Sequence, residues 1–255
     1  MSLWSRGRYQ AVGTRIAGIA AATVAAAGPL AGRHVVDLAC GTGNAALAAA
    51  DAGARVTAVD LTPELIALGA EAAGARPIDW VVADAADTGL PAASFDAAVS
   101  NMGIIFVDPR RQLDEIARLL KPGGTLAFSA WVRTGSSPLQ DPVAAVFGPP
   151  PDIGFSPEQW GDPEIVAARL GRRFTDLALT AGVHRWEFDS LAAAMHFITA
   201  ESPMHVAAFE RADAEQRARL SAGFEAALRA HADPAGAVSF DSPYLVISAA
   251  RAATV

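Results

Sequence analysis

Short apolar runs alternate with amphipathic stretches between residues 34 and 130 of the chain. A short apolar run that is bounded by turn residues predicts a buried strand. We expect five such strands, at residues 34–38, 55–59, 78–82, 95–100 and 125–130. Helices are expected between them; Thr62 and Pro63 begin one and Pro109 begins another. This alternation predicts an α/β fold, a parallel sheet with helices on both faces.

The pattern changes after Trp131. Residues 133–161 are rich in proline, glycine and serine, which predicts loops. Two more strands are expected at residues 174–180 and 244–249, and the segment between them has helical spacing. We therefore expect three parts: an N-terminal helical segment at 1–30 that covers the cofactor, a core of 31–181 and 241–255, and a helical lid or substrate cap at 182–240.

The composition argues against several classes of protein. The formal net charge is −7, and Lys121 is the only lysine. Because nucleic-acid affinity comes mostly from neutralised phosphates, we expect no nucleic-acid partner. Cys40 is the only cysteine, and no cluster has the spacing of zinc ligands. We therefore expect no metal, no internal disulfide and a reducing, cytoplasmic location.

The apolar stretch from Ile16 to Leu30 raises the question of a signal or membrane segment. Alanine, glycine and threonine dominate it, and Arg15 and Arg33 bracket a span shorter than the ~20 residues of a membrane helix. We expect a soluble helix here and no membrane association. The expected partner is a small-molecule substrate, and the protein is expected to be a monomer or a homodimer.

The most informative motif is VVDLACGTGN, residues 35–44. A predicted strand carries Asp37 and leads into the turn Gly41-Thr42-Gly43, and an alanine-rich helix follows. Glycines let the backbone of such a loop approach a ligand closely, with a helix N-terminus behind it. The motif therefore predicts a ligand site after the first strand.

Further polar residues come where the next strands end. Because ligands of open parallel sheets bind beyond the carboxyl ends of the strands, we expect these residues to share one site. Asp60 can accept hydrogen bonds from two ribose hydroxyls. Asp84 can accept one from an adenine amino group, with the Ala85 N–H beside it for a ring nitrogen, and Ser100-Asn101 end the fourth strand. The alternative is that these aspartates merely cap helices.

Two cofactors fit this edge of the sheet. Gly41, Gly43 and Ala46 form a G-x-G-x-x-A pattern, which suits a nicotinamide dinucleotide. Asp37 opposes that reading, because its charge would repel the pyrophosphate by about 4 kcal/mol at ~4 Å. S-adenosylmethionine carries an ammonium and a sulfonium but no phosphate. The electrostatic match therefore favours S-adenosylmethionine.

The chain resembles the class I S-adenosylmethionine-dependent methyltransferases, in the small-molecule branch (methyltransferase type 11) that includes the quinone-biosynthesis C-methyltransferases. The resemblance is carried by VVDLACGTGN, VTAVDLTPELI, VVADAADTGLPAASFDAAVS and RLLKPGGTLAFSAW. It covers residues 30–131 and extends more loosely to Tyr244–Arg251. It implies a Rossmann-like, seven-stranded, mostly parallel sheet with an antiparallel last strand and a helical lid insert. Ala39 departs from the family's usual glycine.

The resemblance also assigns roles around the cofactor. Ala39, Gly41 and Gly43 pass beside its methionine part, Asp60 and Leu61 hold the ribose and flank the adenine, and Ser100 offers backbone to the amino-acid end. The N-terminal segment with Trp4, Arg8 and Tyr9 either folds over the donor pocket or anchors the first helix. The expected cofactor-binding residues are Tyr9, Asp37, Ala39, Gly41, Gly43, Asn44, Asp60, Leu61, Asp84, Ala85, Ser100 and Asn101.

The predicted reaction is methyl transfer from S-adenosylmethionine to a small, largely apolar acceptor by in-line displacement. The residues expected to line the acceptor are Met102, Ile105, Trp131 and His184. A general base is needed only when the acceptor must lose a proton, and His196 is the candidate because of its apolar neighbours. The alternative is a surface or packed lid histidine. The rival functions are a nicotinamide-dependent reductase and a non-catalytic protein that binds S-adenosylmethionine.

Overall fold

A computed structural model describes residues 2–149 and 151–253 of the chain. The described residues form two compact units. Unit 1 contains the described parts of Met1–Arg15, Arg133–Ile153 and Val183–Pro243, and unit 2 those of Ile16–Val132, Gly154–Gly182 and Tyr244–Val255. Each unit is described separately below.

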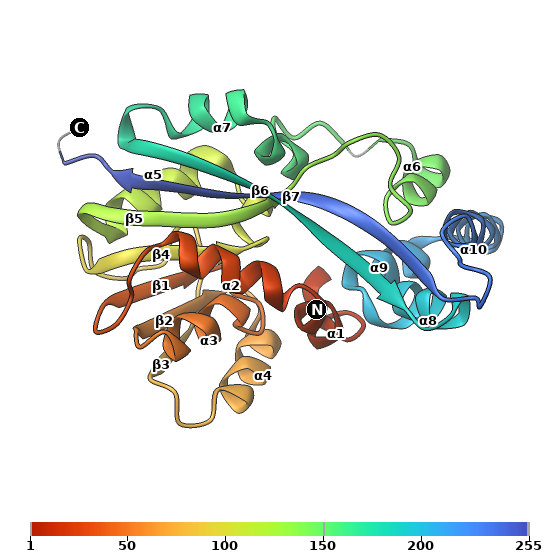
Figure 1. Ribbon diagram of the computed structural model, residues 1–255, viewed down its shortest axis with the longest axis horizontal. Helices are drawn as coiled ribbons and strands as arrows, with labels where there is room; N and C mark the ends of the chain where they lie inside the picture. Colours follow the sequence, from red (N-terminus) through yellow and green to blue (C-terminus); the bar gives the residue numbers. More distant parts are fainter. Residues whose placement is uncertain (1, 150, 254–255) are drawn as a thin grey trace. The chain divides into compact units, whose positions relative to one another are not determined.

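The sheet has seven strands in the order β3-β2-β1-β4-β5-β7-β6 (Figure 1). Its strands are β1 (His34–Leu38), β2 (Arg55–Asp60), β3 (Ile78–Val82), β4 (Phe95–Asn101), β5 (Leu120–Trp131), β6 (Phe174–Phe188) and β7 (Val238–Arg251). Strands β1 to β5 pair in parallel, and β7 pairs antiparallel with β5. The predicted mostly parallel sheet with an antiparallel last strand is confirmed.

The register of the central strands aligns the ends that matter for a ligand. Asp37 of β1 lies opposite Ala58 of β2 and Val99 of β4, and Asp60 of β2 lies opposite Val82 of β3. Since the strands are parallel, their carboxyl ends lie at one edge. Val35 and Val36 of β1 are both fully buried, as expected of a parallel strand that is covered on both faces.

The helices of unit 2 are α2 (Ala17–Ala26), α3 (Asn44–Asp51), α4 (Pro63–Ala73), α5 (Pro109–Leu119) and α7 (Pro163–Leu170), with short 3-10 turns at Ile104–Phe106, Pro157–Gly161 and Gly171–Arg173. Helices α2 and α3 share one core cluster, in which Ala20 and Ala49 pack with Val56 of the sheet. The predicted start of α4 is confirmed, with Thr62 as N-cap and Pro63 in its first turn.

Three strands are longer than the apolar pattern predicted. Strand β5 begins at Leu120, and the register with β4 shifts at Ala97 because the Lys121–Gly124 stretch adds residues on one side. Strands β6 and β7 extend beyond the expected residues through segments without a continuous apolar run, although Trp186, Phe188, Val238 and Phe240 in these segments are buried. Pro243 lies inside β7, just before Tyr244, where pairing with β5 begins.

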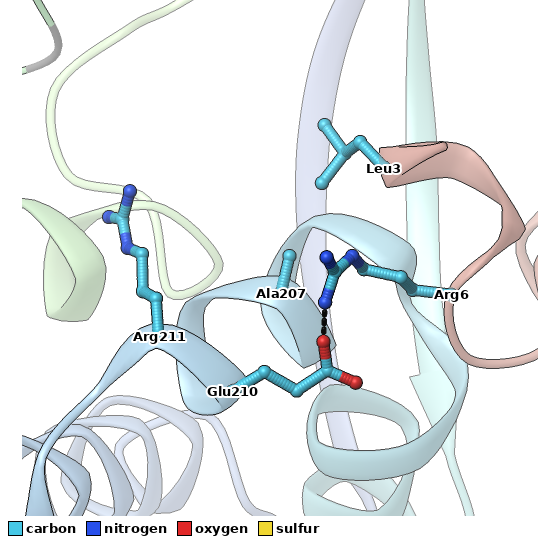
Figure 2. A pocket seen from close by; sticks show the side chains of 5 residues that line it. All are labelled: Leu3, Arg6, Ala207, Glu210 and Arg211. Atoms are coloured by element: carbon cyan, nitrogen blue, oxygen red, sulfur yellow. Dashed lines mark ion pairs between the residues drawn. The ribbon is translucent and has the colours of Figure 1, made fainter. Parts of the chain in front are cut away.

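Unit 1 is mainly helical. Its elements are the 3-10 turn Leu3–Ser5, α1 (Tyr9–Arg15), α6 (Asp141–Phe147), α8 (Leu191–His196), a π-helical turn at Phe197–Glu201, α9 (Pro203–Arg211) and α10 (Ala214–Arg229). Leu220, Phe224 and Leu228 of α10 are fully buried, at the helical spacing that the sequence shows. Figure 2 shows an open pocket of this unit, in which Arg6 pairs with Glu210 beside Leu3 and Ala207, while Arg211 points away from that pair.

A buried polar bridge ties α9 to the loop before α6 within unit 1. His205 of α9 hydrogen-bonds through Nδ1 to the Ser202 hydroxyl at 2.6 Å and through Nε2 to the Leu139 carbonyl at 2.7 Å. Burial lowers the pKa of His205, and the hydrogen bond to the carbonyl opposes that shift. The neutral ring then donates from Nε2 and accepts the hydroxyl proton at Nδ1.

Among residues 2–149 and 151–253, no helix combines the length and the apolar character that crossing a bilayer requires.

Candidate functional site

The loop after β1 requires left-handed backbone. Ala39, Gly41 and Gly43 have φ of 52°, 58° and 85°, respectively, a region that disfavours a Cβ. A Cβ at Gly103 would lie only 2.3 Å from the Ala39 carbonyl oxygen and 2.9 Å from its methyl group. The left-handed φ of Ala39 is a conformation that glycine adopts with less strain than alanine.

Asp60 fastens this loop to the end of β2. Its Oδ2 accepts the N–H of Gly41 at 2.8 Å, and its Oδ1 accepts the N–H of Thr62 at 2.8 Å. The residue is only 8% exposed. The structure thus brings the glycine loop and Asp60 together, as the sequence predicted, and gives the carboxylate a bracing role that the sequence did not reveal.

Asp37 is almost entirely buried beneath the first turn of α3. Its Oδ2 accepts the N–H of Ala46 at 2.8 Å, whereas its buried Oδ1 has no hydrogen-bond partner among the described residues. Burial raises the pKa of Asp37 to about 8, opposed by the Ala46 hydrogen bond and reinforced by the charge of Asp60. Without a ligand this carboxyl is therefore mostly protonated at neutral pH, which the sequence pattern could not show.

The segment after β3 is held by helix α5. Asp84 Oδ1 accepts the N–H of Ala86 at 2.9 Å, and Gln112 of α5 donates from Nε2 to the Ala85 carbonyl at 3.0 Å. Glu115 of α5 accepts two hydrogen bonds from Thr88. Gln112 and Glu115 were missed from the sequence. A sequence signal was available, because Gln112 and Glu115 are three residues apart and lie on the face of α5 that also contains buried Leu113 and Ile116.

The end of β4 is held by a network of hydroxyl groups. Ser100 Oγ donates to the Leu38 carbonyl at 2.7 Å and accepts the N–H of Ile104 at 3.1 Å. Ser129 Oγ donates to Asn101 Oδ1 at 2.9 Å and accepts the N–H of Met102 at 3.0 Å. The backbone therefore turns sharply where β4 ends.

Two of the residues expected to line an acceptor in unit 2 follow this turn directly in the chain, and the third ends the neighbouring strand β5. Met102 has φ of 58° and is 7% exposed, and Ile105 in the next turn is almost fully buried. Trp131 is the last residue of β5 and is partly exposed. A left-handed residue that is not glycine, such as Met102, stores strain of the kind that often marks functional sites.

Two apolar side chains are exposed at the same sheet edge. Leu61, next to Asp60, is 69% exposed, and Val82, which pairs with Asp60 in the sheet register, is 51% exposed. Exposed branched residues beside buried carboxylates offer a planar ring an apolar surface. Leu61 was predicted from the sequence, whereas Val82 was not.

The remaining predicted residues belong to unit 1 and are described with it. Tyr9 begins α1, and its ring meets Trp4 edge-on at 6.3 Å. His184 stacks edge-on with Trp186 at 4.7 Å, and burial together with the Arg15 charge lowers the pKa of His184. The His196 side chain is 62% exposed, with Nε2 at 3.9 Å from the carboxylate of Glu201.

The described part of the chain contains no group of three or more His, Cys, Asp and Glu side chains that could hold a metal ion. Cys40 is buried in the glycine loop, and burial followed by the charges of Asp37 and Asp60 raises the pKa of its thiol. A thiol in that state is a packing residue rather than a nucleophile.

Comparison with known proteins places these motifs in a family. Residues 36–128 match the family described as a methyltransferase domain. An uncharacterised protein of Mycobacterium bovis is 30% identical over 200 residues, which are 76% of this chain and 73% of that protein. A demethylmenaquinone methyltransferase of Clavibacter sepedonicus is 41% identical over 109 residues, 42% of this chain and 44% of that enzyme. With several curated relatives the match spans about half of the relative's length.

A solved structure agrees in fold. A putative methyltransferase from Bacillus halodurans superimposes with a TM-score of 0.61 at 15% identity, covering 92% of this chain and 99% of that protein. The glycine loop after β1 and the aspartate at the end of β2 both lie within the matched residues 36–128. The chain belongs to the class I S-adenosylmethionine-dependent methyltransferases.

Proposed function

We propose that this chain binds S-adenosylmethionine at the carboxyl ends of β1 to β4 and transfers its methyl group to a small, largely apolar acceptor. The bound cofactor supplies an electrophilic methyl group on a sulfonium. The protein supplies binding, alignment and exclusion of water, which account for much of the rate in such displacements.

The unpartnered oxygen of Asp37 is the observation that carries the proposal. A buried carboxyl group with one oxygen unpartnered is costly, and a nearby cation stabilises its ionised form and so lowers its pKa. The Asp37 Oδ1 atom is in this state. The ammonium of an amino acid, reached directly or through water, fits it, whereas a pyrophosphate would deepen the penalty.

The neighbouring strand ends suit the nucleoside. Each Asp60 oxygen accepts one backbone N–H and keeps a lone pair for a ribose hydroxyl. Leu61 and Val82 supply apolar surface for the faces of the adenine. Asp84 and the backbone of Ala85, held by Gln112, face its polar edge. Gly41, Gly43 and Asn44 follow the methionine part, with Ala39, Ser100 and Asn101 beside it.

We propose that the residues directly after β4 line the site of the methyl acceptor. Met102 and Ile105, which are buried in the structure, are proposed to form with Trp131 an apolar wall that favours an acceptor without charge. Tyr9 is proposed to cover the donor and His184 to line the acceptor. His196 is proposed as the base for acceptors that must lose a proton. Its side chain is 62% exposed and lies beside the carboxylate of Glu201.

A binding experiment tests the donor. The protein is titrated calorimetrically with S-adenosylmethionine, S-adenosylhomocysteine and NAD⁺, and thermal unfolding is recorded with each. We expect the two adenosyl compounds to bind and to raise the melting temperature, and NAD⁺ to do neither. Binding of NAD⁺ alone would overturn the donor and favour the reductase.

A turnover experiment tests the acceptor. Release of S-adenosylhomocysteine is followed with phenols, hydroxyquinones and small amines as acceptors. Turnover with an apolar aromatic acceptor supports the proposal. Tight binding of the donor with no turnover across the panel favours a non-catalytic binding protein.

A further inference from the structure

The indole ring of Trp80 in β3 lies against two glycines from different helices of unit 2. A Cβ built on Gly43 would lie 2.3 Å from Trp80 Cη2, and one on Gly69 would lie 2.4 Å from Trp80 Cζ3. Real Cβ atoms do not approach other atoms this closely. The outer edge of the indole therefore fills the space that two missing side chains leave.

The two glycines belong to different segments that flank the candidate site. Gly43 ends the glycine loop and is the N-cap of α3, with φ of 85°. Gly69 lies in α4, the helix that begins directly after Asp60 and Leu61. The Thr42 carbonyl oxygen of the loop would lie 3.1 Å from a Cβ at Gly69. The loop, α4 and the indole thus meet at one point.

Trp80 is itself held in place by the sheet. It pairs in register with Ala58 of β2, and its partly buried side chain packs against the core cluster that contains Ala45 and Ala46. The ring is therefore a rigid spacer rather than a loose surface group. Close packing of this kind transmits a shift of one element to its neighbours.

We infer that Trp80 is a positioning residue for S-adenosylmethionine. Its indole sets the spacing between the glycine loop, which follows the methionine part, and α4, which fixes the ribose and adenine contacts at Asp60 and Leu61. This inference rests on the proposed function. Both halves of the donor are held well only when this spacing is correct, and misplacement by about 1 Å is enough to cost substantial rate.

Substitutions that change the spacing test the inference. Gly69→Ala adds a methyl group against the indole, and we expect it to raise the Kd for S-adenosylmethionine about tenfold. Trp80→Leu removes the spacer, and we expect an increase of about fivefold. In the double variant the smaller side chain makes room for the methyl group, so its Kd is expected to be lower than that of Gly69→Ala alone. Gly18→Ala is the matched control, because a Cβ at this helical glycine meets nothing within 4 Å.

The readout separates positioning from general stability. Kd is measured by calorimetry at a temperature where circular dichroism shows every variant to be folded, and the apo melting temperature is recorded alongside. If Gly69→Ala does not fold, Trp80→Leu and Trp80→Phe carry the test. Folded variants that bind the donor with the wild-type Kd, or a double variant that shows no recovery, would overturn the inference. Failure of the wild-type protein to bind the donor would instead contradict the proposed function.

Discussion

Thr88 donates both its backbone N–H and its hydroxyl to one oxygen of Glu115, at 2.9 and 2.5 Å. The same carboxylate pairs with Arg118 at 2.7 Å. Burial alone would raise the pKa of Glu115, but the hydrogen bonds from Arg118 and Thr88 outweigh it and hold the pKa at about 2. Helix α5 therefore anchors the segment that follows Asp84 through an ionised buried group.

Glu115→Gln is expected to destabilise the protein at neutral pH. Because the folded pKa lies below the ordinary 4.5, the stabilisation is complete above pH 4.5 and is lost as the pH falls toward 2. The shift corresponds to roughly 3 kcal/mol at most. Urea unfolding at pH 7 and at pH 3 should show a large difference between wild type and variant that narrows at the lower pH.

The control for Glu115 is Glu225→Gln in α10. Glu225 pairs with Arg229 one helical turn away, and both side chains are at least half exposed. An exposed pair of this kind contributes about 0.5 kcal/mol or less. An equal loss of stability in the two variants would contradict the role assigned to Glu115.

Asp60→Ala is expected to weaken binding of S-adenosylmethionine at least about tenfold, since two backbone N–H groups and, in the proposed binding mode, two ribose hydroxyls lose their acceptor. Calorimetry at pH 7.5 measures the change. Asp79→Ala serves as the control, because that aspartate is exposed on edge strand β3. An unchanged Kd for Asp60→Ala would contradict the ribose assignment.

The raised pKa of Asp37 predicts that the free energy of unfolding falls as the pH increases. Its carboxyl pKa is raised from the ordinary 3.8 to about 8, so the folded state favours the protonated form. This contribution is complete below pH 3.8 and is lost as the pH rises through 8. Relative to Asp37→Asn, the wild-type protein without ligand should lose unfolding free energy between pH 5 and pH 8.

The same group predicts proton release on donor binding. A cation beside Asp37 lowers its pKa, so the carboxyl gives up a proton when the donor binds near pH 7. Calorimetry in two buffers of different ionisation enthalpy counts the protons released. Wild type should release more protons than Asp37→Asn, because the variant can release only the protons that the ligand itself loses. Equal release would show that Asp37 does not sense the ligand's charge.

His205→Gln is expected to destabilise the protein by about 2 kcal/mol at pH 7.5, because a buried hydrogen-bonded bridge is lost. Since the folded pKa of His205 lies below the ordinary 6.5, its contribution is complete above pH 6.5 and is lost as the pH falls toward the folded pKa. The difference between variant and wild type, measured by urea unfolding, should shrink between pH 7.5 and pH 5. The exposed His196 provides the control substitution, His196→Gln, which should change stability at neither pH.

The order of strands and helices in the core could be predicted from the sequence. A buried parallel strand appears as a continuous apolar run, so β1 was predicted with its observed ends. Strand β3 was also predicted with its observed ends, although it is a partly exposed edge strand, because Ile78, Trp80 and Val81 are apolar. The long strands β6 and β7 were underestimated, because buried residues such as Phe188 and Phe240 alternate with more exposed residues in the added segments. A continuous apolar run marks a strand that is covered on both faces, whereas alternation is a weaker signal for the ends of a strand.

The sequence by itself determined the family and the sheet edge that carries the candidate site, because glycine spacing and carboxylates at strand ends are local features. Only the tertiary structure decided that Asp37 is buried and mostly protonated, that Gln112 and Glu115 hold the segment after β3, and that Trp80 fills the space above Gly43 and Gly69. These properties depend on desolvation and on contacts between residues far apart in the chain. Only the packing of the folded chain decides which of these distant residues come into contact.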